Sequence, residues 1–151
     1  MSASVPRVHH SAICTRNWDA SVRFWRDGLG LQPLMENTFD GSWSELFGAT
    51  GDKLHSVFLG DPGQPDGGIV EIVEFPTGID DGAPIAGPAV GFFLLSFYVD
   101  VDATLARLAD MGLGGEARRI IVAGGGGAPT VMAVVRDPDG VIVELIGVGQ
   151  G

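Results

Sequence analysis

Hydrophobic positions recur at helical spacing at two places along the chain, one in each half. Trp18, Val22 and Trp25 recur at i, i+4 and i+7, the stripe of an amphipathic helix. They belong to the segment that runs from Trp18 through DASVRFWRDGLG at 19–30. A comparable stripe runs through DATLARLADMGLG at 102–114. The two segments align when a single residue is inserted, so the pattern predicts one equivalent helix in each half.

Runs rich in β-branched and aromatic residues surround both predicted helices. One such run precedes each helix, at 7–15 and 92–100, and three follow it. The following runs are 31–37, 53–60 and 68–75 in the first half, and 117–123, 129–137 and 141–148 in the second. Each half therefore reads β-α-β-β-β.

This pattern predicts an α+β fold for residues 1–151 as a single domain. We expect a first βαβββ module at 7–76, a linker at 77–87 and a second module at 88–149. One module alone would leave a sheet face bare, so two modules must pair, within one chain or between two chains. The sequence leaves that choice open, and a homodimer is the expected assembly.

The last strand of each half repeats almost letter for letter, as PDGGIVEI at 65–72 and PDGVIVEL at 138–145. Pro-Asp-Gly predicts a tight reversal, and the apolar run after it predicts a buried strand. Glu71 and Glu144 interrupt these runs. A buried carboxylate is costly unless it is paired, protonated or bound to a cation, and two inward carboxylates repel each other. The repeat therefore predicts a functional role for both glutamates.

Composition narrows the function further. The formal net charge of −10 makes nucleic acid an improbable partner. It would suit a cationic ligand, but acidity of this kind more often only keeps a protein soluble. The N-terminus lacks an apolar signal segment, and the most apolar stretch, 89–99, is too short to span a bilayer, so we expect a cytoplasmic protein with no membrane partner. Cys14 is the single cysteine, and its place in a predicted strand indicates a buried, inert thiol.

The segments VHHSAICTRNWDASVRFWRDGLGL at 8–31 and RDPDGVIVELIG at 136–147 resemble the vicinal oxygen chelate superfamily. That superfamily includes glyoxalase I, methylmalonyl-CoA epimerase, extradiol dioxygenases and bleomycin-resistance proteins. The resemblance implies two pseudo-symmetric βαβββ modules that form a cup-shaped mixed β-sheet with helices outside. It also implies a small organic molecule as the ligand of the cup.

Metal-using members of that superfamily hold a divalent ion with residues of the first and last strands of each module. Carried over, the resemblance implies the metal ligands His10, Glu71 and Glu144. The fourth position falls on Leu94, or on Phe93 with the other offset of the repeat, and neither can bind a metal. One imidazole with carboxylates suits Fe, Mn, Ni, Co or Zn.

Three functions remain open on this basis. A three-ligand metal would assist an isomerase or lyase reaction with Glu71 or Glu144 as a catalytic group. Alternatively, the cup holds no metal and sequesters an organic ligand, as bleomycin-resistance proteins do. The third possibility is metal-free acid–base chemistry on a natural product. An extradiol oxygenase is disfavoured, because the second histidine of those relatives is absent.

Several further side chains are candidates for ligand contact. The loop 37–56 has no counterpart of equal length in the second half, and its aromatic residues would cover the cup or plug an interface. His55, at the rim of the predicted cup, and the apolar residues Phe93 and Leu94 are further candidates. The predicted ligand-binding residues are Trp43, Phe47, His55, Phe93 and Leu94.

Overall fold

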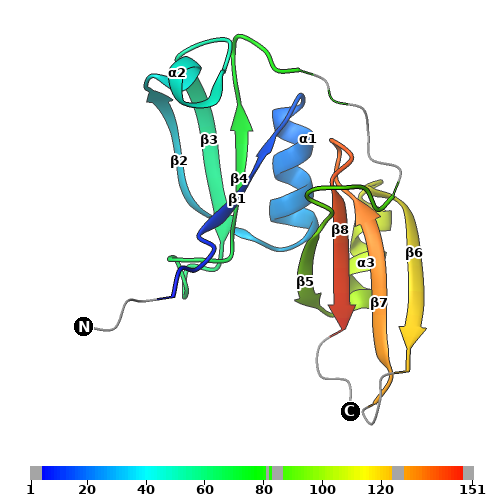
Figure 1. Cartoon of the computed structure of the whole chain (residues 1–151). Helices are drawn as coiled ribbons and strands as arrows, with labels where there is room; N and C mark the ends of the chain where they lie inside the picture. The colour runs from blue at the N-terminus through cyan, green and yellow to red at the C-terminus, as the bar shows by residue number, and fades with distance from the viewer. Residues whose placement is uncertain (1–4, 81, 83–86, 124–127, 148–151) are drawn as a thin grey trace. The chain divides into compact units, whose positions relative to one another are not determined.

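The computed structural model describes residues 5–80, 82, 87–123 and 128–147, and it divides into two compact units, Met1–Asp81 and Gly82–Gly151 (Figure 1). The predicted linker at 77–87 includes residues 81 and 83–86, which lie outside the described residues. Each unit contains one four-stranded mixed sheet.

The first unit follows the predicted order of elements. Its elements are β1 (His10–Cys14), α1 (Trp18–Val22), η1 (Arg23–Gly28), β2 (Gln32–Asp40), α2 (Trp43–Phe47), β3 (Lys53–Gly60) and β4 (Ile69–Glu74). The strands lie in the order β1-β4-β3-β2, with β1 parallel to β4 and the other neighbours antiparallel. This order brings the first and last strands together in the sheet.

The second unit has the same strand arrangement. Its elements are β5 (Leu95–Val99), α3 (Val101–Asp110), β6 (Gly114–Val122), β7 (Thr130–Arg136) and β8 (Ile142–Gly147). The strands lie in the order β5-β8-β7-β6, and β5 is parallel to β8. The α+β class and the two βαβββ modules are therefore confirmed.

Three details differ from the sequence-based expectation. The strand expected from residue 92 begins only at Leu95, so Phe93 and Leu94 precede it. The loop after residue 37 contains the short helix α2, which the spacing of hydrophobic residues did not predict. The first helix is α-helical only to Val22, and it continues as the π-helical segment η1.

The buried residues of α1 and η1 keep the spacing of an amphipathic helix. They are Ser21, Phe24, Trp25 and Gly28, at i, i+3, i+4 and i+7. The Asn17 side chain accepts a hydrogen bond from Ala20 N at 3.1 Å and caps the start of α1.

The helix and the functional site of the first unit occupy opposite faces of its sheet. Val57 lies opposite Ile72 and Leu59 opposite Val70, and all four are at most 2% exposed, so they form the core face. Trp18 of α1 contacts His55 of β3 with ring centroids 4.5 Å apart, which places the helix on this same face. The other face of the sheet carries Glu71.

In the second unit, α3 uses Val101, Thr104 and Leu108 as its buried side. Asp100 caps the helix by accepting a hydrogen bond from Ala103 N at 3.1 Å. None of the helices in the part of the chain that the structure describes is long and apolar enough to cross a membrane.

Candidate functional site

The alternation of β1 and β4 brings His10 and Glu71 together. Ala12 is the direct partner of Glu71 in the parallel pair, and His10 lies two residues before Ala12, on the same face. His10 Nε2 and Glu71 Oε1 are 3.4 Å apart, with side chains 39% and 12% exposed. This separation exceeds the ~2.7–2.9 Å of a charge-assisted hydrogen bond, so the two groups face each other without a tight direct contact.

The second oxygen of Glu71 is already held by the protein. Ser56, which is fully buried on β3, donates its hydroxyl proton to Glu71 Oε2 at 2.8 Å. The serine thereby fixes the orientation of the carboxylate and leaves Oε1 turned toward His10. Such outer contacts are the usual means of orienting a metal ligand or an acid–base group.

His10 is oriented in turn by its neighbour. His9 Nδ1 and His10 Nδ1 are 2.9 Å apart, so one of these atoms carries a proton and the other accepts it. When His10 is the donor, its Nε2 presents a lone pair beside Glu71. When His9 is the donor, His10 Nε2 carries a proton toward Glu71. The ring of Phe58 packs edge-on against His10, with centroids 5.6 Å apart.

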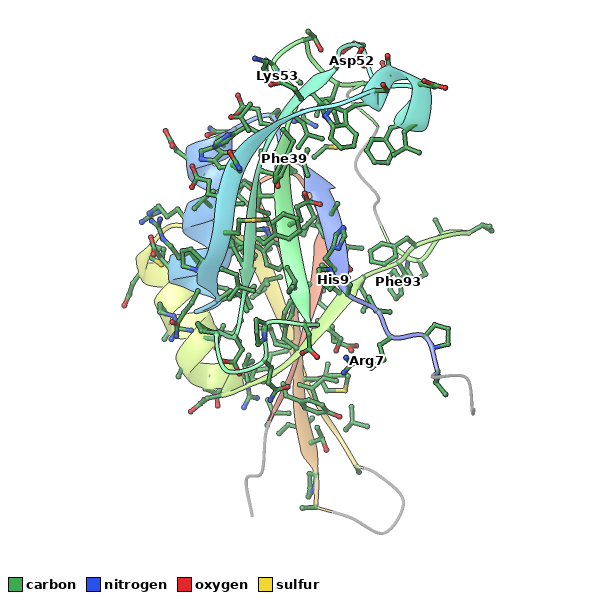
Figure 2. The ribbon with its side chains drawn as sticks, turned by 90° about the vertical axis from the view of Figure 1, so that its left-hand side faces the viewer. Arg7, His9, Phe39, Asp52, Lys53 and Phe93 are labelled. Atoms are coloured by element: carbon green, nitrogen blue, oxygen red, sulfur yellow. The ribbon has the colours of Figure 1, made fainter. Side chains whose placement is uncertain are left out.

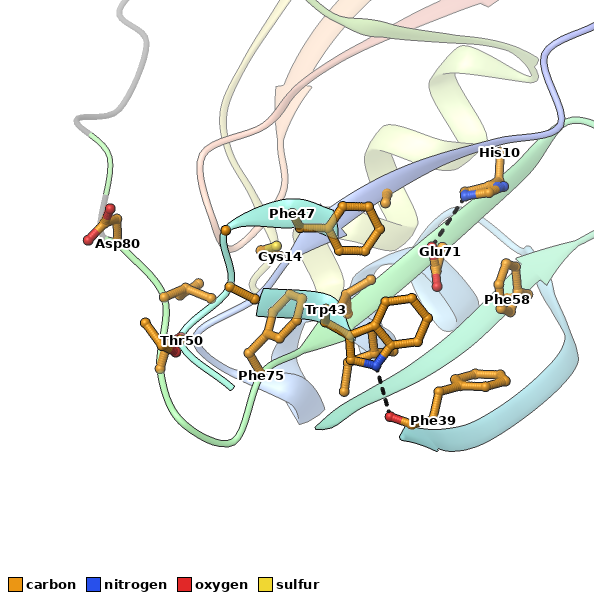
Figure 3. Close-up of a pocket in the computed structure, with 17 residues that line it drawn as sticks. His10, Cys14, Phe39, Trp43, Phe47, Thr50, Phe58, Glu71, Phe75 and Asp80 are labelled. Atoms are coloured by element: carbon orange, nitrogen blue, oxygen red, sulfur yellow. Dashed lines mark hydrogen bonds and ion pairs between the residues drawn. The ribbon is translucent and has the colours of Figure 1, made fainter. Parts of the chain in front are cut away.

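This pair belongs to a cavity of about 650 Å³ on the face of the first sheet opposite α1 (Figure 3). Five aromatic side chains contribute to its wall: Phe39, Trp43, Phe47, Phe58 and Phe75. Ala12, Leu54, Val73 and Ile79 add aliphatic surface. The cavity is therefore mostly apolar, with the His10–Glu71 pair as its main polar feature.

The short helix α2 supplies two of these rings. Trp43 and Phe47 are stacked, with an interplanar angle of 7° and centroids 5.6 Å apart. Trp43 Nε1 donates a hydrogen bond to Phe39 O at 3.1 Å, which ties the helix to the end of β2. Gly48 ends the helix with φ 70°, a left-handed conformation that favours glycine.

Asp52 stabilises the start of α2 (Figure 2). Its Oδ1 accepts hydrogen bonds from the backbone N and the hydroxyl of Ser44, at 2.8 and 2.7 Å. These bonds favour the ionised carboxylate and hold the Asp52 pKa below its usual range. Both contacts hold the start of α2, Trp43 to the end of β2 and Ser44 to the residue just before β3.

The structure does not bring His55 to this cavity. His55 lies on the helix-covered face, where Nδ1 is 2.8 Å from Thr38 Oγ1 and Nε2 is 3.0 Å from Glu36 Oε2. Trp43 and Phe47, by contrast, both line the cavity.

The second unit holds Glu144 in a related setting. Ser96 Oγ donates to Glu144 Oε1 at 2.8 Å. Glu144 and Phe93 line a separate cavity of about 410 Å³, together with Arg118 and Arg136. Ser96 is the strand partner of Glu144 as Ala12 is of Glu71, so Leu94, two residues before Ser96, occupies the position equivalent to His10.

The donor atoms of the first unit fit two positions around a metal ion. Donors that each lie ~2.1 Å from one ion are about 3.0 Å apart at an octahedral angle and about 3.4 Å apart at a tetrahedral angle. The His10–Glu71 separation of 3.4 Å falls in this range. Within either unit, the described residues contain no group of three His, Cys, Asp or Glu side chains suited to a metal. Glu144, the third predicted ligand, belongs to the other unit.

Two kinds of site residue escaped the sequence reasoning. Phe39, Phe58 and Phe75 line the cavity. Alternation from Glu71 through Val73 would have found Phe75, whereas Phe39 and Phe58 lie on other strands and are assigned to this face only by the strand pairing. The prediction of a buried Cys14 was wrong. Cys14 is exposed and lines the cavity, because it alternates with His10 and Ala12 onto the same face of β1.

Comparisons with known proteins agree with this architecture. The family model of the Glyoxalase/Bleomycin resistance protein/Dioxygenase superfamily matches residues 7–145. The lactoylglutathione lyase-like protein terB of Aspergillus terreus (strain NIH 2624 / FGSC A1156) is 34% identical over 148 residues, which cover 92% of this chain and 74% of that protein.

Solved structures show the same fold at lower identity. A glyoxalase family protein from Bacillus cereus superposes with a TM-score of 0.70 at 19% identity, covering 96% of this chain and 95% of that chain. The trypanothione-dependent glyoxalase I of Leishmania major superposes with a TM-score of 0.59 at 22% identity, covering 95% and 87%.

Proposed function

Since the chain belongs to the Glyoxalase/Bleomycin resistance protein/Dioxygenase superfamily, we propose that it is a metal-assisted enzyme of the isomerase or lyase type that acts on a small organic molecule. The observation that carries the proposal is the His10–Glu71 pair, with Nε2 and Oε1 3.4 Å apart at the wall of a largely apolar cavity. Fold membership alone would not support an activity, because one fold hosts many reactions.

His10, Glu71 and Glu144 are the residues we propose as ligands of a divalent ion. One imidazole and two carboxylates suit Fe, Mn, Ni, Co or Zn. When bound, such an ion would polarise a substrate carbonyl or hydroxyl and stabilise negative charge that develops on its oxygen. Leu94 contributes no donor, so a site of this kind has three protein ligands, a common number in catalytic centres.

The protein's own groups would orient the substrate and move its proton. Glu71 Oε1 faces the cavity with its other oxygen held by Ser56, so it can accept a proton without losing its position. His10 Nε2 has its lone pair free for the ion when His10 donates its Nδ1 proton to His9. The surrounding aromatic wall would exclude water once a substrate fills the cavity, which would strengthen these interactions.

The three-ligand hypothesis is tested by elemental analysis of protein purified without chelators or a polyhistidine tag. We expect near-stoichiometric metal in the wild type and less than about a tenth of it in His10→Gln, Glu71→Gln and Glu144→Gln, because each change removes a ligand. Glu74→Gln is the matched control. It lies on β4 three residues after Glu71, does not line the cavity, and should retain the metal.

A folded wild type without metal would contradict the metal-assisted function. The same conclusion would follow if Glu74→Gln lost as much metal as Glu71→Gln.

Two other functions are favoured by specific features. The apolar wall and the replacement of a fourth ligand by Leu94 suit a ligand-sequestering protein of the bleomycin-resistance type. The His10–Glu71 pair suits metal-free acid–base chemistry. Unchanged ligand recovered after prolonged incubation with metal-loaded protein would favour sequestration. Turnover that survives complete metal removal would favour the acid–base enzyme.

We further propose a homodimer, in line with the need of each module to cover its sheet face. Light scattering coupled to size exclusion tests this. A mass near twice the chain's 15.7 kDa is expected, and a monomer at micromolar concentration would contradict it.

A further inference from the structure

The cavity of the first unit is lined mainly by aromatic side chains, with few polar groups and no Lys or Arg, and this lining favours one class of ligand. We infer that it takes a flat aromatic molecule without an anionic group, oriented with a hydroxyl or carbonyl oxygen toward His10 and Glu71. The inference rests on the proposed function in one respect, since it takes the same cavity to be the substrate site.

The first support is the aromatic wall. Trp43, Phe47 and Phe58 all contribute rings to the cavity, from α2 and β3, and Phe39 and Phe75 add two more. Figure 3 shows these rings surrounding one space. Ring faces and edges recognise other rings by offset stacking and edge-to-face contact, which aliphatic ligands cannot reproduce.

The second support is the distribution of polar groups. In the view of Figure 3, His10 and Glu71 lie on one side and Thr50 and Asp80 on the other, with Phe47, Trp43 and Phe75 between them. A ligand with an oxygen at one end and an aromatic body therefore matches the wall along its length. The cavity of about 650 Å³ has room for a molecule of two or three fused rings.

The acidic lining of the cavity disfavours anionic ligands. None of the described residues that line the cavity is Lys or Arg, whereas Glu71 and Asp80 are both acidic. The whole chain carries a formal charge of −10. A glutathione conjugate carries two carboxylates, and an ion held at His10 and Glu71 would pair with one of them at most. The other would meet like charge and no Lys or Arg in this cavity.

Hydrogen bonds within the protein hold the aromatic wall. Trp43 is held by Phe39 O, and Thr50 Oγ1 lies 2.7 Å from Thr77 Oγ1 and donates to Gly78 O at 2.9 Å. Phe47 is nevertheless 63% exposed, so it offers apolar surface that a ligand would cover. A preformed, partly exposed ring lowers the entropic cost of binding.

The inference is tested by isothermal titration of the wild-type full chain with probes that share a ring system and differ in charge. The probes are 2-naphthol, 2-naphthylmethylammonium, 2-naphthoate and S-benzylglutathione. We expect saturable binding of the first two, and binding of 2-naphthoate and S-benzylglutathione at least ~10-fold weaker. Equal or tighter binding of either anion, or no saturable binding of 2-naphthol up to millimolar concentration, would overturn the inference.

Variants locate the binding. Phe47→Ala should weaken 2-naphthol binding about tenfold, since it removes a stacking ring. Leu46→Ala is the matched control. Leu46 lies on the same helix, is 67% exposed and does not line the cavity, so affinity should change less than about twofold. An equal loss in both variants would overturn the inference. If Phe47→Ala fails to fold by circular dichroism, the wild-type charge series decides alone.

The outcome is separable from that of the proposed function. Aromatic binding that persists in metal-free protein and in Glu71→Gln would leave the ligand class intact while the metal-assisted enzyme fails. Stoichiometric metal with a preference for S-benzylglutathione would leave the enzyme intact while the ligand class fails.

Discussion

Replacing Ser56 with alanine tests whether the carboxylate of Glu71 is held in place by one buried hydrogen bond. Ser56 is fully buried and donates to Glu71 Oε2 at 2.8 Å. The change removes one oxygen atom and leaves the β3 backbone intact. No solvent reaches position 56 to replace the lost donor, so the cost falls on the carboxylate.

The expected cost follows from the kind of bond. A hydrogen bond to a charged group contributes ~1.5–3 kcal/mol when water cannot substitute for it. Ser96→Ala is the matched control, because Ser96 donates to Glu144 at the same distance of 2.8 Å but is exposed to solvent. We expect that control to change stability by less than about 0.5 kcal/mol.

Urea unfolding separates the two effects. All three tryptophans, Trp18, Trp25 and Trp43, belong to the first unit, so their fluorescence reports on the unit that contains Ser56. A loss of ~2 kcal/mol would lower the midpoint by about 1 M at the usual slope. Far-UV circular dichroism reports the secondary structure of both units and therefore also follows the Ser96→Ala control.

A double-mutant cycle tests whether the lost stability comes from the hydrogen bond between Ser56 and Glu71. Ser56→Ala should cost much less in a Glu71→Gln background, with a coupling energy of at least ~1 kcal/mol. Equal stability losses in Ser56→Ala and Ser96→Ala, or a Ser56→Ala protein within about 0.5 kcal/mol of wild type, would refute the reasoning.

Three further predictions concern the cavity. Because the Asp52 pKa is lowered in the folded state, its stabilisation of α2 is present above the unfolded-state pKa and is lost as the pH falls through the folded-state pKa. The tryptophan emission of the wild type should therefore shift below about pH 4. Asp52→Asn should lack this transition. Gly48→Ala should destabilise the first unit by ~1 kcal/mol, because φ is 70° there, whereas Gly82→Ala should leave the melting temperature unchanged, since nothing lies within 4 Å of its added Cβ. Cys14 should react with a thiol reagent, and saturating 2-naphthol should slow that reaction several-fold; an unchanged rate would contradict its place in the ligand cavity.

Most of the fold was accessible from the sequence because it rests on local periodicity. The repeated helix segments and the repeated PDG turns announced two βαβββ units, and the structure has both. The helix α2 was missed because five residues are too few to show a helical stripe, and its stability comes from Asp52 and Gly48 instead. The π-helical continuation at η1 was missed because its period differs from the one sought.

The site was accessible only in part. Strand parity and the family resemblance selected His10 and Glu71, and the structure brings these two together. The wall of the cavity depends on which strands are neighbours, so Phe58, opposite Glu71 on β3, could not be recognised before the pairing was known. His55 shows the same limit, because its face of the sheet follows from register and not from composition.

The two glutamates accept hydrogen bonds from different neighbouring strands, so the sequence repeat does not extend to the residues that donate to them. Ser56 belongs to β3, whereas Ser96 belongs to β5, the counterpart of β1. By register, the counterpart of Ser96 is Ala12 and the counterpart of Ser56 is Met132. The duplicated halves therefore share an interaction and not a pair of positions. A residue-by-residue alignment of the two halves would therefore not detect this shared interaction.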